Sequence, residues 1–250
     1  MPKLLRICLT GMLISFLGSL PLGTLNVAAM QISVSKGLFP AFLFSSGSLA
    51  AEVVYVRLSL IAMDWVRRQQ KLFKALEWVT LLIVLGLAAS SFYAALHPDL
   101  DESPVLNTTM PMFLFGFLMS LVNPVQIPFW FGWSTVLFTK KILLPKNSHY
   151  NIYIVGIGLG TLLGNCVFIF GGQLIADKIN NNQHILNYVI GGIFTLTAIV
   201  QIWKMAKKKD TTHQIEHPEE LTKKFEEKLE NFEEKMDSIQ EKLDQEKNKD

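Results

Sequence analysis

Six apolar segments, each long enough to cross a bilayer, constrain this chain more than any other feature. A membrane-spanning helix needs about 20 predominantly apolar residues, and half of the 250 residues are hydrophobic while only 18% are charged. Because backbone groups in hydrocarbon must be satisfied within the protein, such segments fold as helices. We therefore predict an all-α integral membrane protein with six transmembrane helices, at residues 4–34, 38–63, 72–96, 110–138, 150–176 and 185–205.

A change in composition divides the chain near residue 209. We expect residues 1–209 to form the transmembrane domain and residues 210–250 to form a charged tail without a spanning segment. The first apolar segment resembles a secretory signal, because Lys3 and Arg6 precede it. Its apolar run continues to Val34, however, well beyond a signal's core of about 7–15 residues. We therefore expect this segment to be retained as the first span.

Positive charge sets the expected orientation. Lysine and arginine accumulate in cytoplasmic loops, and here they lie before the first span, in the second and fourth connections and after the last span. They are Lys3, Arg6, Arg67, Arg68, Lys71, Lys74, Lys140, Lys141, Lys146, Lys204, Lys207, Lys208 and Lys209. The other connections hold only Lys36 and Lys178. The pattern predicts a multi-pass protein of the cell membrane (inner or plasma membrane) with both termini in the cytoplasm.

Two of the spans are interrupted near their middle by a polar break that contains proline. The first break is Leu20-Pro21-Leu22-Gly23-Thr24-Leu25-Asn26, and the second is Val122-Asn123-Pro124-Val125-Gln126-Ile127-Pro128. A break at this depth frees backbone groups that protein, water or ligand must satisfy, and paired breaks in the two halves of a membrane protein point to a substrate site. The candidate site residues are therefore Pro21, Gly23, Asn26, Asn123 and Pro124.

The two asparagines beside the breaks have two interpretations. Asn26 and Asn123 carry donors and acceptors that suit a substrate's amino and carboxylate groups, and the same atoms suit the ends of broken helices. The half-helix after each break also presents a partly positive N-terminal end, where a carboxylate can bind without an arginine. The residues alone leave substrate binding and helix capping open.

Glu52 is the candidate coupling residue. Like Pro21, Pro124 and Asn165, it falls near the middle of its span, where a carboxylate is costly and normally faces a bundle interior or a wet cavity. Proton coupling is one interpretation, because burial favours the uncharged carboxyl group and substrate arrival can change its protonation. The alternative is a structural role in which Glu52 pairs with Arg57 or is capped by the hydroxyl group of a neighbouring residue.

The two halves of the chain resemble each other. Leu76-Glu77-Trp78-Val79 in the third span matches Leu186-Asn187-Tyr188-Val189 in the sixth, 110 residues later, and Glu52 corresponds to Asn165, 113 residues later. An odd number of spans in each repeat inverts one half relative to the other. We therefore expect two inverted three-helix repeats, with Asn165 as a further site residue.

The order of these motifs resembles the LysE/RhtB-type amino-acid exporter family. It comprises Pro21-x-Gly23-x-x-Asn26, the turn at residues 35–37, Glu52 five residues after a glycine, and Asn123-Pro124, over about residues 8–205. The family typically has Pro-Gly-Pro at the first break and aspartate in place of Glu52. The resemblance implies a secondary-active transporter, an antiporter, that exports amino acids or related small metabolites and is coupled to protons or another ion.

The tail has the apolar seam of a coiled coil or amphipathic helix. Its apolar residues recur at alternating intervals of four and three, as Phe225, Leu229, Phe232, Met236, Ile239 and Leu243. Such a stripe implies a partner, most simply the same tail of another subunit. A second candidate dimer face is the series Gly156, Gly160 and Gly164, whose spacing is typical of close helix packing. The alternative is a solvated, partly helical extension.

Other classes of function fit the sequence less well. Cys8 and Cys166 would serve a membrane thiol-redox carrier, and the tail would suit a membrane anchor that recruits a partner. A hydrolase is weaker still, because the histidines lie at loops or in the tail without metal-ligand spacing. We expect no enzyme activity, cofactor or metal, and no nucleic-acid partner, because the tail is acidic. The identity of the transported solute stays open.

Overall fold

The chain folds into helices that provide four to six candidate membrane spans. The computed structural model describes residues 3–20, 23–61, 70–97, 109–178, 183–207, 213–214, 219–220, 223, 225–227 and 230–231. Within this part of the chain, four helices are long and apolar enough to cross a bilayer, and two bent helix pairs pass the same test as single spans. The same residues contain no β-strand. The prediction of an all-α membrane protein is confirmed, and six spans are the upper end of this range.

The two predicted breaks coincide with the two bends. The unbroken helices are α3 (Leu38–Ile61), α5 (Gln70–Leu96), α8 (Asn147–Lys178) and α9 (Gln183–Ala206). The first bent pair is α1 (Lys3–Ser19) with α2 (Thr24–Lys36), at 76°, and the second is α6 (Met112–Leu121) with α7 (Gln126–Thr139), at 69°. Pro21 lies outside the described residues.

Glycines bring two helix pairs into close contact, α1 along α8 and α6 along α3. A Cβ atom at Gly47 of α3 would overlap the Phe113 carbonyl group of α6. On α8, Gly156, Gly160 and Gly164 lie equally close to α1, so this series, a candidate dimer face in the sequence, packs within the chain. Small residues allow such close approach, and van der Waals contact then holds the helices together in lipid.

The short helix α2 is enclosed on all sides. Its buried residues are Val27, Ala28, Ala29, Met30, Gln31, Ile32 and Ser33, and it packs on α3, α8 and α9. Ser33 donates a hydrogen bond to the Ile169 carbonyl of α8 at 2.8 Å, and the Gln173 amide donates to Ser33. Only Gly37 links α2 to α3, at a φ of +91° that favours glycine.

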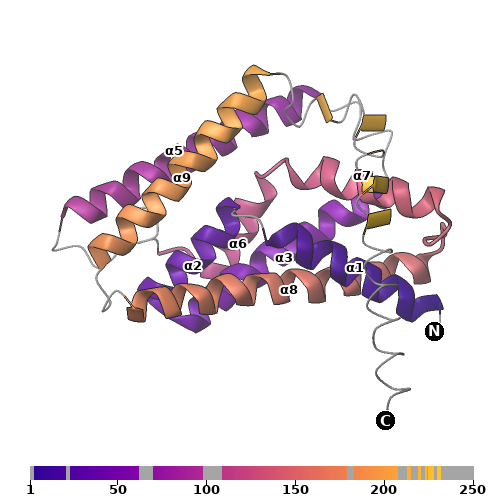
Figure 1. Cartoon of the computed structure of the whole chain (residues 1–250), viewed down its shortest axis with the longest axis horizontal. Coiled ribbons are helices and arrows are strands. Elements are labelled where there is room, and N and C mark those ends of the chain that lie inside the picture. Colours follow the sequence, from indigo (N-terminus) through magenta and orange to yellow (C-terminus); the bar gives the residue numbers. More distant parts are fainter. Residues whose placement is uncertain are drawn as a thin grey trace, which may run out of the picture.

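The helices α5 and α9 lie side by side, at an angle to the remaining helices (Figure 1). Polar residues are buried along this pair. Gln201 of α9 donates a hydrogen bond to the Glu77 backbone carbonyl of α5 at 2.9 Å, and the Glu77 side chain is only 3% exposed. The α5–α9 pair therefore carries a buried carboxyl group of its own, separate from that of Glu52 on α3.

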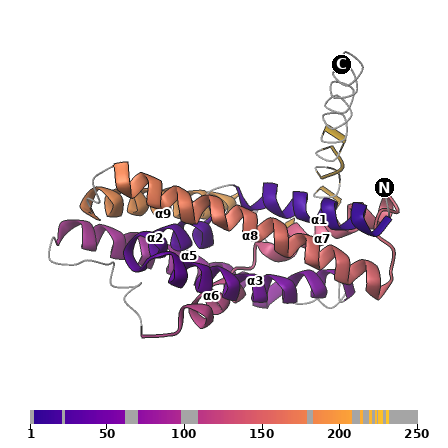
Figure 2. The same ribbon diagram turned by 90° about the horizontal axis from the view of Figure 1, so that it is seen from below.

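The described tail residues lie near α7 and α1, at one end of the bundle (Figure 2). Phe225, the first residue of the predicted seam, packs on Phe129 and Trp133 of its own chain. The other five seam residues lie outside the described residues. A coiled coil between subunits thus stays a prediction, and in this conformation Phe225 is occupied by α7.

We expect Gly47→Ala to destabilise the protein by about 1–3 kcal/mol, because the added methyl group must displace the backbone of α6. Gly86→Ala is the matched control, since a Cβ atom there meets nothing within 4 Å and alanine favours a helix. Thermal unfolding in detergent should give a lower midpoint for the first variant and an unchanged or higher midpoint for the second. Equal midpoints would contradict a close crossing of α3 and α6.

Candidate functional site

Glu52 lies where four helices meet. Its carboxylate on α3 accepts a hydrogen bond from Thr161 Oγ1 of α8 at 2.7 Å, and the Thr161 hydroxyl lies 2.5 Å from Ser15 Oγ of α1. The Trp130 side chain of α7 also interacts with the carboxyl group. Ser15, Thr161 and Trp130 are buried, and Glu52 is half-buried.

The hydrogen bonds at Glu52 have a defined direction. A charged carboxylate only accepts, so Thr161 commits its one proton to Glu52 and Ser15 must donate to Thr161. A protonated Glu52 can instead donate to Thr161, which frees the threonine proton for Ser15. The protonation state of Glu52 is therefore transmitted from α3 to α1 through two hydroxyl groups.

Arg57 is bound to α8 rather than to Glu52. Its guanidinium donates to Asn151 Oδ1 at 3.1 Å and to Asn147 Oδ1 at 3.3 Å. The guanidinium carbon also lies 5.5 Å from the centre of the Tyr150 ring. Glu52 therefore does not pair with Arg57 in this structure, but the Thr161 hydroxyl caps it, which is the other form of the structural alternative.

Both asparagines beside the breaks satisfy backbone groups. Asn26 Nδ2 donates to the Ser19 carbonyl at the end of α1, and Asn123 Oδ1 accepts from the Val125 N–H at 3.3 Å. The Pro124 carbonyl accepts from the Ile127 N–H at 3.2 Å. These hydrogen bonds give both asparagines the capping role that the sequence left open. The bond at Asn123 uses its Oδ1 atom, and the amide nitrogen of the same side chain can donate to another group.

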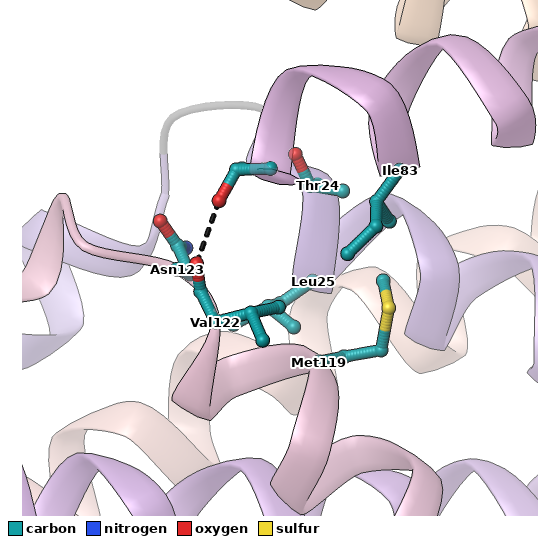
Figure 3. Close-up of a pocket in the computed structure, with 7 residues that line it drawn as sticks. Thr24, Leu25, Ile83, Met119, Val122 and Asn123 are labelled. Atoms are coloured by element: carbon teal, nitrogen blue, oxygen red, sulfur yellow. Dashed lines mark hydrogen bonds between the residues drawn. The ribbon is translucent and has the colours of Figure 1, made fainter. Parts of the chain in front are cut away.

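A small cavity of about 10 Å³, which has room for about one water molecule, lies between the two breaks and α5 (Figure 3). It is lined by Thr24, Leu25, Thr80, Ile83, Met119, Val122 and Asn123. Thr80 Oγ1 of α5 donates to the Val122 carbonyl at 2.7 Å, which satisfies a group that the second break leaves free. The structure thus brings Asn123 and the start of α2, next to Gly23, into one site.

Glu52 and Asn165 do not line this cavity. Asn165 lies one helical turn after Thr161 on α8 and is 6% exposed. The predicted site residues therefore separate into a cavity at the breaks and a polar group around Glu52. The two parts are joined by α1, which ends at the first break, and by α7, which begins at the second.

A second buried polar cluster joins α2 to the α5–α9 pair. Gln31 Nε2 donates to Ser91 Oγ and to Asn187 Oδ1, each at 3.3 Å. Gln31 is 2% exposed and Asn187 is 3% exposed. Within the described part of the chain, Gln31 Oε1 and Asn187 Nδ2 have no hydrogen-bond partner, so the cluster keeps an acceptor and a donor group to spare there.

Most of the hydroxyl groups at these sites belong to residues that the sequence pattern does not mark as functional. Ser15, Thr161 and Thr80 lie in apolar runs and belong to no motif. Serine and threonine in helices commonly bond their own backbone, as Thr195 does to the Gly191 carbonyl. Their presence in a span therefore gives no signal, and only contacts between distant helices distinguish them.

The described residues hold no group of three or more His, Cys, Asp or Glu side chains placed to bind a metal. Cys8 and Cys166 are free. The Cys8 backbone lies beside Gly156 of α8, and Cys166 follows ten residues later, about 15 Å along the helix. A disulfide needs Cα atoms within about 7 Å, so the two thiols do not form a redox pair here.

Comparison with known proteins gives one family. The model of the LysE type translocator family matches residues 16–204. The chain is also similar to "Putative amino acid efflux protein YcgF" of Bacillus subtilis (strain 168), with 24% identity over 147 residues that cover 58% of this chain and 70% of the relative. No solved structure matches the chain significantly.

We expect Thr80→Val to destabilise the protein by about 1 kcal/mol or more, because the Val122 carbonyl loses its donor beside the cavity. Thr197→Val is the matched control: its hydroxyl bonds the Ile193 carbonyl within α9, a group that belongs to an unbroken helix. Thermal unfolding of both variants in the same detergent checks this. A Thr80→Val midpoint at or above that of the control would argue against this capping role.

Proposed function

The chain belongs to the LysE type translocator family, and on that basis we propose that it is a secondary-active exporter of amino acids or related small metabolites. The observation that carries the proposal is the cavity between the two bent spans, where Thr24, Thr80 and Asn123 lie among apolar side chains. The similar B. subtilis protein is named for amino acid efflux, the same direction of transport.

We place the substrate's carboxylate at the start of α2. Thr24 and Leu25 are the first residues of this helix and line the cavity. The first N–H groups of a helix have no partner within it and carry the positive end of its dipole. Gly23, the N-cap residue, makes no side-chain hydrogen bond to them. Asn123 then has amide N–H groups for a second contact.

The cavity lining favours a neutral substrate side chain. Leu25, Ile83, Met119 and Val122 supply the apolar part of the lining, and no charged residue is among the residues that line it. An isolated charge in such surroundings would be costly. We therefore assign amino acids with small, uncharged side chains as the preferred substrates.

Coupling is assigned to Glu52, which supports exchange of the substrate for a proton or another ion. A charged carboxylate at mid-depth is costly, so its protonation is sensitive to its surroundings. Ser15 lies one turn before the end of α1, and Trp130 lies one turn after the start of α7. Protonation of Glu52 therefore acts on the two helix ends that border the breaks, and through them on the cavity.

Internal symmetry supports the expected two inverted repeats. The α5–α9 pair joins Gln201 to Glu77, and the Gln31 cluster joins Ser91 to Asn187. Asn187 follows Glu77 by 110 residues, and Gln201 follows Ser91 by the same 110. In both contacts, a residue at the repeat position shared by Glu77 and Asn187 lies near a residue at the repeat position shared by Ser91 and Gln201. With the orientation from the lysines and arginines, the proposal is a cell-membrane antiporter with cytoplasmic termini.

We expect Glu52→Gln to fold normally but to lose the response of transport to a pH gradient, because glutamine cannot exchange a proton. Counterflow of labelled amino acids in proteoliposomes measures this. Thr161→Val should reduce coupled transport roughly tenfold by removing a hydrogen bond to a charged group, while Thr161→Ser, which keeps the hydroxyl, should not. A Glu52→Gln protein with unchanged gradient response would remove Glu52 from the mechanism.

We expect amino acids with small neutral side chains to compete for counterflow, and lysine, arginine and glutamate not to compete. Met119→Ala should shift preference toward larger neutral side chains by about tenfold, because a change of a methylene or more in a pocket is worth roughly that ratio. Leu118→Ala is the control, since Leu118 is exposed on the outside of α6. Preferential transport of charged amino acids would overturn the assigned substrate class.

A further inference from the structure

The turn between α7 and α8 is closed by the side chain of His149. After the end of α7, the Ile142 and Leu143 N–H groups both donate to the Leu137 carbonyl at 3.0 Å. The next N–H group, that of Leu144, donates to His149 Nδ1 at 3.2 Å. His149 lies in the first turn of α8 and is only 7% exposed. The imidazole thus joins the turn to the start of the second helix.

This hydrogen bond requires a neutral imidazole. A backbone N–H group can only donate, so Nδ1 must offer its lone pair and the ring proton must lie on Nε2. In the protonated ring both nitrogen atoms are donors, and Nδ1 can no longer accept a hydrogen bond. Uptake of a proton by His149 therefore breaks the bond and leaves the Leu144 N–H group without this partner.

Two other histidines bond to the backbone in the opposite sense. His97 Nδ1 lies 2.9 Å from the Tyr93 carbonyl oxygen, and His184 Nδ1 lies 2.6 Å from the Ala95 carbonyl oxygen. A carbonyl oxygen only accepts, so Nδ1 is the donor in both contacts, and a protonated ring donates equally well. Acid therefore preserves these two hydrogen bonds, whereas it removes the one at His149.

Positive charge gathers around this turn. Among the described residues, the charged side chains in the turn and at the adjoining ends of α1 and α3 are Lys3, Arg6, Arg57, Lys140, Lys141 and Lys146. Lys3 and Lys146 act on the His149 imidazole electrostatically, and Lys140 pairs with Glu230 at 3.0 Å. The first turn of α8 also carries the positive end of the helix dipole. A protonated His149 would therefore meet repulsion as well as lose its hydrogen bond.

The two helices that this turn joins both contact Glu52. The Thr161 hydroxyl comes from α8, and the Trp130 side chain comes from α7. Leu143 of the turn is 1% exposed and belongs to the hydrophobic cluster that contains Trp130. The place of the turn therefore bears on the place of Trp130 beside Glu52, and the His149 contact helps to hold both.

We propose that His149 is a pH-sensing positioning residue: its neutral imidazole holds the α7–α8 turn and keeps transport fast, and its protonation releases the turn and slows transport. The proposal rests on the proposed transport function. Histidine side chains titrate between about pH 5 and pH 8, so the contact with Leu144 is complete at the alkaline end of this range and is lost as the pH falls. The lysines and arginines predict that this end of the bundle faces the cytoplasm, so the residue responds to acid on that side.

The test compares counterflow rates of full-length variants in proteoliposomes with equal pH on both sides, at about pH 7.5 and about pH 5.5. The rate of the unmodified protein should fall at least about fivefold at the lower pH, because one lost hydrogen bond changes an equilibrium by a factor of about 5–30. His149→Asn, whose Oδ1 replaces Nδ1 as an acceptor and does not titrate, should lose most of this fall. His149→Leu, which has no acceptor, should be slow at both pH values. The matched control His97→Gln should fall as the unmodified protein does.

The contact itself is measured without transport, by hydrogen exchange of the Leu144 amide in detergent relative to its intrinsic rate at each pH. Protection should fall in acid in the unmodified protein and persist in His149→Asn. Protection that does not depend on pH would overturn the proposal, as would a His149→Asn rate that falls as far as that of the unmodified protein. Protection that falls in acid, in a protein that transports no amino acid at either pH, would instead overturn the transport function and with it the role of His149 in transport.

Discussion

A helix that stops inside hydrocarbon leaves peptide groups that protein, water or a ligand must satisfy, and the rest of this structure is arranged around two such places. The Ser19 carbonyl receives Asn26, the Val122 carbonyl receives Thr80, and the Leu121 carbonyl receives the Tyr55 hydroxyl. The donors come from α2, α5 and α3. The first hydrogen bond joins the two halves of one bent span, and the other two tie the second break to α5 and α3; the Thr80–Val122 bond borders the cavity.

The glycine crossings determine which polar groups can meet. Because Gly160 admits the backbone of α1 so closely, Ser15 reaches Thr161 on the adjoining turn of α8, and Thr161 reaches Glu52 on α3. A bulkier α8 would separate these hydroxyl groups beyond hydrogen-bond distance. The packing of apolar helices and the chemistry at Glu52 therefore depend on the same small residues, and stability and transport are not separable properties in this part of the molecule.

The spans and breaks could be predicted because they depend on local composition. About 20 apolar residues imply a helix, and proline with glycine or asparagine implies its interruption, so the bends fall at the predicted segments. The capping role of Thr80 and the Gln31–Asn187 contact could not be predicted, because they depend on how helices far apart in the sequence are placed against each other. Phe225 shows the same limit: its spacing is typical of a coiled-coil seam, yet its ring packs on α7.

The one-residue link between α2 and α3 has a mechanical consequence. Gly37 adopts φ +91° and ψ 176°, a conformation that is essentially restricted to glycine, and it leaves no slack between the two helices. If α2 moves to admit or release a solute, the start of α3 must stay beside the end of α2, because the link spans a single residue. Glu52 lies fourteen residues further along α3, so a movement of the helix that begins at the cavity is passed directly to the helix that carries the carboxyl group.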